Sequence, residues 1–196
     1  MAQNKVISDY KVVIIGGSAG SLQALMNILP GIPAISTFAL VLVLHRRSTD
    51  DLTLERLIKI RTKVPVEIVE DKLPFVPGYL YVAPSNYHLL FEKNGTLALD
   101  SSEKVNYSRP SIDVSFESAA EVYGRNLVGI LLSGSNADGT AGIKAIQAAG
   151  GIVIIQDPTS AEMSFMPNHA IQNSTPDYIM HPHEILDFIN SIDTLY

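Results

Sequence analysis

Short runs of Val, Ile and Leu alternate with longer amphipathic stretches along the whole chain. Five runs consist almost entirely of apolar residues, which is typical of strands buried on both faces of a parallel sheet. They span 11–15, 39–44, 127–132, 152–156 and 178–180. Five stretches with apolar residues at helical spacing predict helices over 22–29, 51–61, 112–123, 141–149 and 184–192. The pattern predicts an α/β fold, a doubly wound, mostly parallel sheet with helices on both faces.

The segment 66–99 interrupts this alternation. It contains Pro74, Pro77, Gly78 and Pro84, which end regular elements, and an Asn94-Gly95 pair, which favours a tight hairpin turn. We therefore expect a short antiparallel addition at one edge of the sheet, with its hairpin turning at Asn94-Gly95.

Length and composition favour one globular domain. The chain has 196 residues, of which 46% are hydrophobic, enough for one core. We expect a single domain over 1–196 with a core of about 11–192. The apolar runs are far shorter than the roughly 20 residues of a membrane helix, and the N-terminus lacks the apolar region of a signal peptide, so we expect a cytoplasmic protein without membrane insertion.

Charge and cysteine content exclude several function classes. The chain has no cysteine, which excludes disulfides, thiolate metal sites and a cysteine nucleophile. The formal net charge is −6, which argues against a nucleic-acid partner because phosphate binding relies on clustered Lys and Arg.

A G-x-S-x-G sequence follows the first predicted strand and precedes a predicted helix. It runs from Gly16 to Gly20 with Ser18 at its centre. A tight turn at this place exposes the serine hydroxyl, and the start of the helix offers N–H groups to developing negative charge. The alternative is a glycine-rich turn that binds a phosphate. Against it, Ser18 and Ser21 stand where a dinucleotide fingerprint requires glycine, and no G-K-[ST] follows.

A base and an acid for Ser18 follow two other predicted strands. His45 comes directly after 39–44, and Asp138 lies in the small, polar loop after 127–132. The carboxyl ends of parallel strands meet at one edge of a sheet, so the three side chains are expected there together. His45 is then the candidate general base and Asp138 the carboxylate that orients it. An Asp138 that only caps the helix near Thr140 is the simpler alternative.

The chain order serine, histidine, aspartate resembles that of the CheB-type protein-glutamate methylesterases. The resemblance extends over nearly the whole chain through further motifs in the same order. These are Pro77-Gly78, Tyr81-Val82-Ala83-Pro84, His88-Leu89, Arg109-Pro110-Ser111-Ile112-Asp113, Gly129-Ile130-Leu131-Leu132-Ser133-Gly134, Asp138-Gly139, Ala149-Gly150-Gly151 and Met166-Pro167. It implies a Rossmann-like sheet, hydrolysis of glutamate methyl esters on chemoreceptors, deamidation of some glutamines, and no metal or organic cofactor.

The same resemblance implies a role for each site residue. Ser18 attacks the ester carbonyl, His45 moves the proton, and Asp138 orients His45. Backbone N–H groups near Ala19 and Ser135 are the expected oxyanion donors. Apart from the resemblance, the chain is acidic and its expected substrate protein is acidic too, which makes Arg46 and Arg47 beside His45 a candidate docking pair. The alternative is that both are solvated surface residues.

Two departures from the family pattern give a second hypothesis. Ala19 replaces the usual Thr, and the loop usually written Thr-Gly-Met-Gly-Asn-Asp-Gly is Ser133-Gly134-Ser135-Asn136-Ala137-Asp138-Gly139. A binding or adaptor module with weak turnover in a sensory system is therefore the alternative function. We also expect no receiver domain, because about ten residues precede the first strand. A separate regulatory partner is then one way to control the site.

Overall fold

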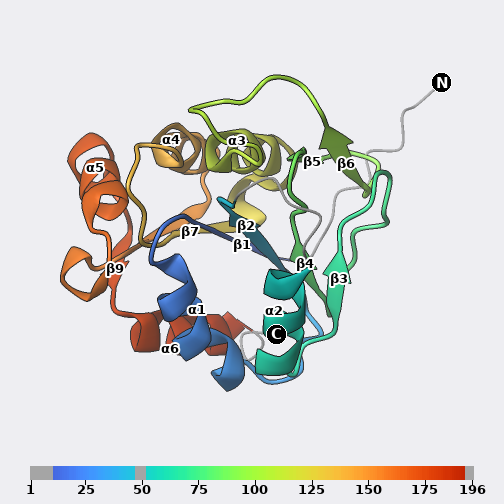
Figure 1. Ribbon diagram of the computed structural model, residues 1–196, viewed down its shortest axis with the longest axis horizontal. Helices are drawn as coiled ribbons and strands as arrows, with labels where there is room; N and C mark the ends of the chain where they lie inside the picture. Colours follow the sequence, from blue (N-terminus) through green and yellow to red (C-terminus); the bar gives the residue numbers. More distant parts are fainter. Residues whose placement is uncertain (1–10, 47–51, 193–196) are drawn as a thin grey trace.

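The computed structural model describes residues 11–46 and 52–192 and contains a seven-stranded parallel sheet (Figure 1). The strand order is β3-β4-β2-β1-β7-β8-β9, and all neighbours pair in parallel. The strands are β1 (Lys11–Gly17), β2 (Phe38–Leu44), β3 (Val66–Ile68), β4 (Leu80–Val82), β7 (Leu127–Leu131), β8 (Ile152–Gln156) and β9 (Tyr178–Met180). The predicted α/β class is confirmed.

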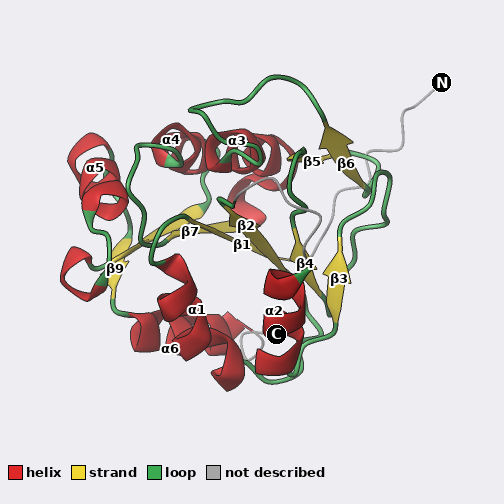
Figure 2. Ribbon diagram, viewed as in Figure 1, coloured by secondary structure: helices red, strands yellow, loops and turns green. Residues whose placement is uncertain are grey.

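Helices cover both faces of the sheet (Figure 2). On one face lie α1 (Ser21–Ile28), α2 (Thr53–Arg61) and α6 (Pro182–Ile192), and on the other lie α3 (Ile112–Tyr123), α4 (Thr140–Ala148) and α5 (Phe165–Asn173). Short 3₁₀ helices also lie at Leu29–Gly31, Gly124–Asn126 and Pro158–Ser160. The predicted helix start at Asp51 lies outside the described residues.

Alternate residues of β1 belong to two separate cores. Val12 and Ile14 pack with α3, α4 and α5, while Val13 and Ile15 pack with α1, α2 and α6. All four are fully buried. This double burial explains why residues 12–15 are apolar at each position instead of alternating with polar residues.

The segment 66–99 differs in part from its prediction. Its first half supplies β3 and β4, which join the main sheet in parallel. Its second half forms an antiparallel hairpin of β5 (His88–Phe91) and β6 (Leu97–Asp100), which is a separate sheet and not an edge addition. The strands β3 and β4 have three residues each, too few to show a period in the sequence. Gly95, with φ of 82°, lies in the predicted turn.

The helix α5 was not predicted. Its apolar face is weak, because Met166, Pro167 and Ala170 are its only buried residues. A proline in its first turn is compatible with a helix, since the N–H groups there have no partner within the helix.

The order of the strands places three loops side by side. The central strand β1 has β2 on one side and β7 on the other. The loops that follow these strands therefore leave one edge of the sheet together, the usual place for a site in an α/β fold. Among the helices in 11–46 and 52–192, none combines the length and apolar character needed to cross a bilayer.

Candidate active site

Ser18 lies in the tight turn between β1 and α1. Its N–H donates to the carbonyl of Ser133 at 2.9 Å, which ties the turn to the loop after β7. Its own carbonyl accepts from the N–H of Ser21 at 3.1 Å and from the Ser21 hydroxyl at 2.7 Å. These bonds fix the backbone on both sides of the Ser18 hydroxyl, which is partly exposed.

Glycine is required in this turn. Gly20 has φ of +79°, and a Cβ built on it lies 2.6 Å from Cβ of Glu162 and 2.7 Å from Oγ of Ser133. A Cβ on Gly16 lies 2.5 Å from a methyl group of Ile112, the first residue of α3. The motif therefore permits both the turn and the close approach of α3 to the end of β1.

His45 connects Ser18 to Asp138. It follows β2, and its N–H donates to the carbonyl of Gly17 at 3.0 Å. Its ring nitrogen Nδ1 is 3.1 Å from Ser18 Oγ, and Nε2 is 2.6 Å from Asp138 Oδ2. The histidine side chain is 9% exposed and that of Asp138 is 0% exposed. The structure thus brings together the three residues expected at this edge, with the imidazole between the other two.

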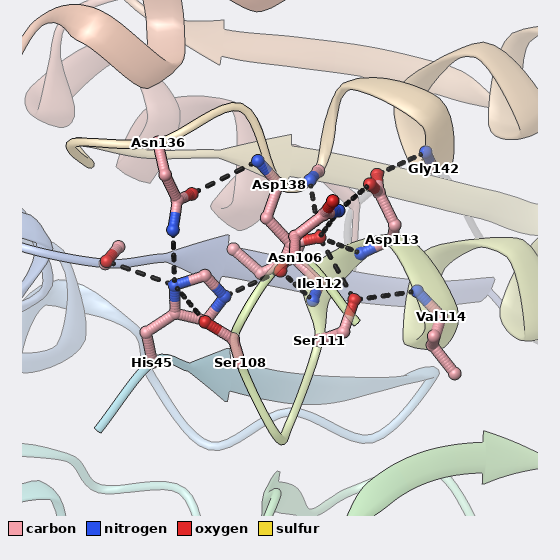
Figure 3. Close-up of polar contacts among 12 residues, drawn as sticks. His45, Asn106, Ser108, Ser111, Ile112, Asp113, Val114, Asn136, Asp138 and Gly142 are labelled. Atoms are coloured by element: carbon pink, nitrogen blue, oxygen red, sulfur yellow. Dashed lines mark hydrogen bonds and ion pairs between the residues drawn. The ribbon is translucent and has the colours of Figure 1, made fainter. Parts of the chain in front are cut away.

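The Asp138 carboxylate lies at the N-terminus of α3 (Figure 3). Oδ2 accepts the N–H of Ile112 at 2.7 Å, and Oδ1 accepts the N–H of Asp113 at 3.0 Å. Further donors to Oδ1 are the Ser111 hydroxyl at 3.0 Å, the Gly139 N–H at 3.1 Å and the Asn106 amide at 3.3 Å. The simpler reading, a cap on the helix at Thr140, is incomplete, because most of these donors belong to α3 and its approach.

These donors keep Asp138 charged. Burial alone raises the pKa of its carboxyl, but the hydrogen bonds from His45, Asp113 and Ile112 outweigh burial and lower the pKa to about 2. A charged carboxylate only accepts hydrogen bonds, so the proton in the 2.6 Å contact belongs to His45 Nε2. When Nδ1 carries no proton, it is an acceptor that faces the Ser18 hydroxyl.

A second buried carboxyl, that of Asp113, adjoins Asp138. It accepts the Gly142 N–H at 2.8 Å, and the Asn106 amide donates to it at 3.0 Å. Burial and the neighbouring negative charge of Asp138 raise its pKa to about 6, although the Gly142 N–H opposes the shift. Asn106 therefore bridges two carboxyl groups.

The other predicted site residues have different surroundings. Ala19 and Ser135 are exposed, and the Ala19 carbonyl accepts the Ser133 hydroxyl at 2.8 Å, which joins the two loops. Arg46 donates to Glu55 Oε1 at 2.5 Å and to the Ala83 carbonyl at 3.2 Å. Its guanidinium thus neutralises a buried carboxylate of α2 instead of remaining a solvated surface group. Arg47 lies outside the described residues.

Several polar residues around the triad were not singled out from the sequence. They are Asn106, Ser108, Ser111, Asp113 and Asn136, and all contact His45 or Asp138 (Figure 3). Ser111 and Asp113 belong to a motif of the resemblance and Asn136 to the altered loop before Asp138, but no role was predicted for them at the triad. Asn106 and Ser108 lie just before that motif. In residues 11–46 and 52–192, no group of three or more His, Asp or Glu side chains gathers as metal ligands would.

Known proteins resemble this chain in sequence and in fold. The sequence profile of the CheB methylesterase family matches residues 13–189. The chain belongs to the CheB methylesterase family. A solved CheB-family structure, the methylesterase catalytic domain of Thermotoga maritima, superposes with a TM-score of 0.88 at 29% identity, and the match covers 96% of this chain and 100% of that one.

Curated CheB-family relatives differ in length. A putative protein-glutamate methylesterase/protein-glutamine glutaminase of Leptospira interrogans is 39% identical, over 94% of this chain and 96% of that protein. The Thermotoga maritima protein-glutamate methylesterase/protein-glutamine glutaminase is 32% identical, over 89% of this chain and 52% of that protein. The chain thus spans nearly all of the first relative and about half of the second.

Proposed function

We propose that the chain is a serine hydrolase that cleaves methyl esters of glutamate side chains on proteins and deamidates glutamine side chains. The observation that carries the proposal is the continuous contact from Ser18 Oγ to His45 Nδ1 and from His45 Nε2 to Asp138 Oδ2. Family membership and the names of the relatives support the same activity.

In the proposed reaction, His45 Nδ1 removes the proton of the Ser18 hydroxyl as Oγ attacks the ester carbonyl carbon. The charged Asp138 stabilises the imidazolium that forms. Nδ1–H then protonates the departing methoxy oxygen, and methanol leaves an acyl-enzyme on Ser18. Water hydrolyses this ester with the same histidine as base. Glutamine deamidation follows the same steps with ammonia as the leaving group.

Two parts of the proposal concern the surroundings of the reacting atoms. We assign the oxyanion donors to backbone N–H groups near Ala19 and Ser135, on two loops that Ser133 joins through its carbonyl and hydroxyl oxygens. For the substrate, we propose a methylated chemoreceptor or a related sensory protein in the cytoplasm. For regulation, we propose a separate protein partner that controls the site.

Release of methanol from a methylated receptor tests the proposal. Wild type releases methanol, and Ser18→Ala lowers the rate by at least about 10³-fold because the nucleophile is lost. Ser191→Ala is the matched control, since this exposed hydroxyl donates to the Phe188 carbonyl within α6, away from the site. Equal methanol release by wild type and Ser18→Ala would exclude a hydrolase that depends on Ser18. If both rates also equal that of a blank without protein, the adaptor hypothesis is favoured.

A further inference from the structure

Three polar groups converge on one nitrogen of His45. Nδ1 is 3.1 Å from Ser18 Oγ, 3.3 Å from Ser108 Oγ and 3.5 Å from Asn136 Nδ2. Figure 3 shows the contacts of Ser108 and Asn136 with the same ring nitrogen of His45. Because Nε2 carries the ring proton, Nδ1 has a single lone pair. It accepts from Ser18 when the nucleophile is activated, so the other two groups are not needed for that step.

The orientation of Asn136 is fixed by the site. Its Oδ1 accepts the N–H of Asp138 at 3.1 Å. The Nδ2 amino group must then face His45, where it only donates. At 3.5 Å it is too far from Nδ1 for a strong hydrogen bond, which leaves the amino group able to donate to a third atom placed next to Nδ1.

Ser108 is held by a tight turn that is anchored on the carboxylates. Ser108 and Val105 exchange backbone hydrogen bonds of 2.9 and 3.2 Å. Between them, Asn106 and Tyr107 have φ of 49° and 63°, the sign that a type I′ turn requires at both central positions. The Asn106 amide donates to Asp113 and to Asp138. These contacts hold the backbone of Ser108 next to the triad.

Ser108 and Asn136 can both act in deacylation, the second half of the reaction. In the acyl-enzyme, Ser18 Oγ is part of an ester and cannot donate to Nδ1. The leaving methanol and the attacking water occupy the same place next to Nδ1, since one histidine protonates the first and deprotonates the second. A molecule there accepts from the Asn136 amino group and either donates to or accepts from the Ser108 hydroxyl.

We propose that Ser108 and Asn136 form the site that holds the leaving alcohol, and then the hydrolytic water, against His45 Nδ1. In deacylation the water oxygen bonds to the acyl carbon while Nδ1 takes a water proton. The bond from carbon to Ser18 Oγ then breaks, and the proton passes from Nδ1 to Oγ. The inference rests on the proposed function. It concerns the loop in which Asn136 stands where the family pattern usually has glycine.

Hydrolysis of p-nitrophenyl acetate separates the two halves of the reaction. Nitrophenolate leaves without protonation, so acylation needs no leaving-group site, whereas deacylation still needs a positioned water. Stopped-flow release of nitrophenolate measures acylation, and intact-mass analysis of isolated acyl-enzyme measures deacylation. We expect Ser108→Ala to slow deacylation about tenfold, the effect of one lost hydrogen bond, and to leave acylation within about twofold.

Two further variants and one reagent sharpen the test. Ser108→Thr keeps the hydroxyl and restores deacylation, and Ser102→Ala, an exposed serine bonded to Asp100, changes neither rate. Hydroxylamine, which attacks the acyl-enzyme without a bound water, removes most of the defect of Ser108→Ala. Equal slowing of both halves by Ser108→Ala means that Ser108 only orients His45, and this overturns the inference but not the hydrolase. Absence of Ser18-dependent turnover in wild type overturns both.

Discussion

Asp138 accepts the backbone N–H of Ile112 at 2.7 Å, which places the carboxylate on the first turn of α3. The same oxygen faces His45 Nε2 at 2.6 Å. The partial positive charge of a helix N-terminus stabilises a carboxylate and adds to the hydrogen bonds that keep this one ionised. The acid of the proposed triad therefore depends on the docking of a helix that lies far from it in the chain.

Replacement of the carboxylate by an amide tests this dependence. In Asp138→Asn, the amide NH₂ group faces N–H and O–H donors and cannot accept from them. His45 can then carry its proton on Nδ1 instead of Nε2, and Nδ1 no longer accepts from Ser18. We expect kcat to fall about 10³ to 10⁴-fold, because the orientation of the base is lost. Asp187→Asn in α6 removes an exposed carboxylate and is the matched control. Activity of Asp138→Asn near that of the control would contradict a catalytic role for Asp138.

The Asp113 carboxyl gives stability a pH dependence of opposite sign to the usual carboxylate effect. Burial and the charge of Asp138 raise its pKa to about 6, above the unfolded value of about 3.9. Its contribution to the free energy of unfolding is full below about pH 4 and is lost as the pH rises through about 6. Asp138, with a lowered pKa, loses its contribution only as the pH falls from about 3.9 toward 2.

Asp113→Asn should remove the loss near pH 6. Relative to this variant, wild type should lose about 1 to 2 kcal/mol of stability between pH 4.5 and 7.5. Thermal unfolding of both proteins at the two pH values measures the change. A difference in Tm between them that stays constant with pH would show that Asp113 does not titrate in this window.

Arg46 offers a direct choice between two roles. It pairs with Glu55, whose side chain is 2% exposed, and removal of one partner leaves a buried charge. Arg46→Met should therefore lower the free energy of unfolding by about 3 kcal/mol, and adding Glu55→Leu should recover most of it. Urea unfolding measures both. If Arg46 instead docks the substrate protein, Arg46→Met raises KM for that protein with unchanged stability.

Alanine variants of two glycines with the same backbone conformation separate the cost of backbone strain from the cost of steric crowding. Gly20 and Gly95 have φ of +79° and +82°, but an added Cβ is crowded at Gly20 and meets nothing within 4 Å at Gly95. Gly95→Ala should cost about 1 kcal/mol for its backbone alone. Gly20→Ala should cost about 2 to 4 kcal/mol and reduce activity, because it moves the turn of Ser18. Equal costs in chemical unfolding would mean that the turn relaxes freely.

The sequence predicted the parts of the fold and site that depend on local patterns. Buried parallel strands are apolar at every position, so the central strands were visible as runs. Ser18 was marked by its glycines, and His45 and Asp138 by their places after two strands. Parallel strands end at one edge, so simple geometry was enough to expect the three residues together.

The remaining features depend on tertiary relations that no local pattern shows. Asn106 and Ser108 matter because a turn lies against His45, and Asp113 because α3 begins beside Asp138. The parallel pairing of β3 with β4 was missed because each is three residues long. In the sequence, nothing distinguishes Arg46 from a surface residue next to the histidine. Its partner Glu55 is apparent only once α2 is placed beside it.

The separation of the triad along the chain has a consequence for protein synthesis. Asp138 follows His45 by 93 residues. The N-terminus of α3 and Asn106, which both donate to the Asp138 carboxylate, lie between them in the sequence. A growing chain therefore exposes the serine and the histidine well before it contains their acid. In the proposed mechanism, the nascent polypeptide therefore cannot use Ser18 as a nucleophile until its second half has left the ribosome and Asp138 has reached His45.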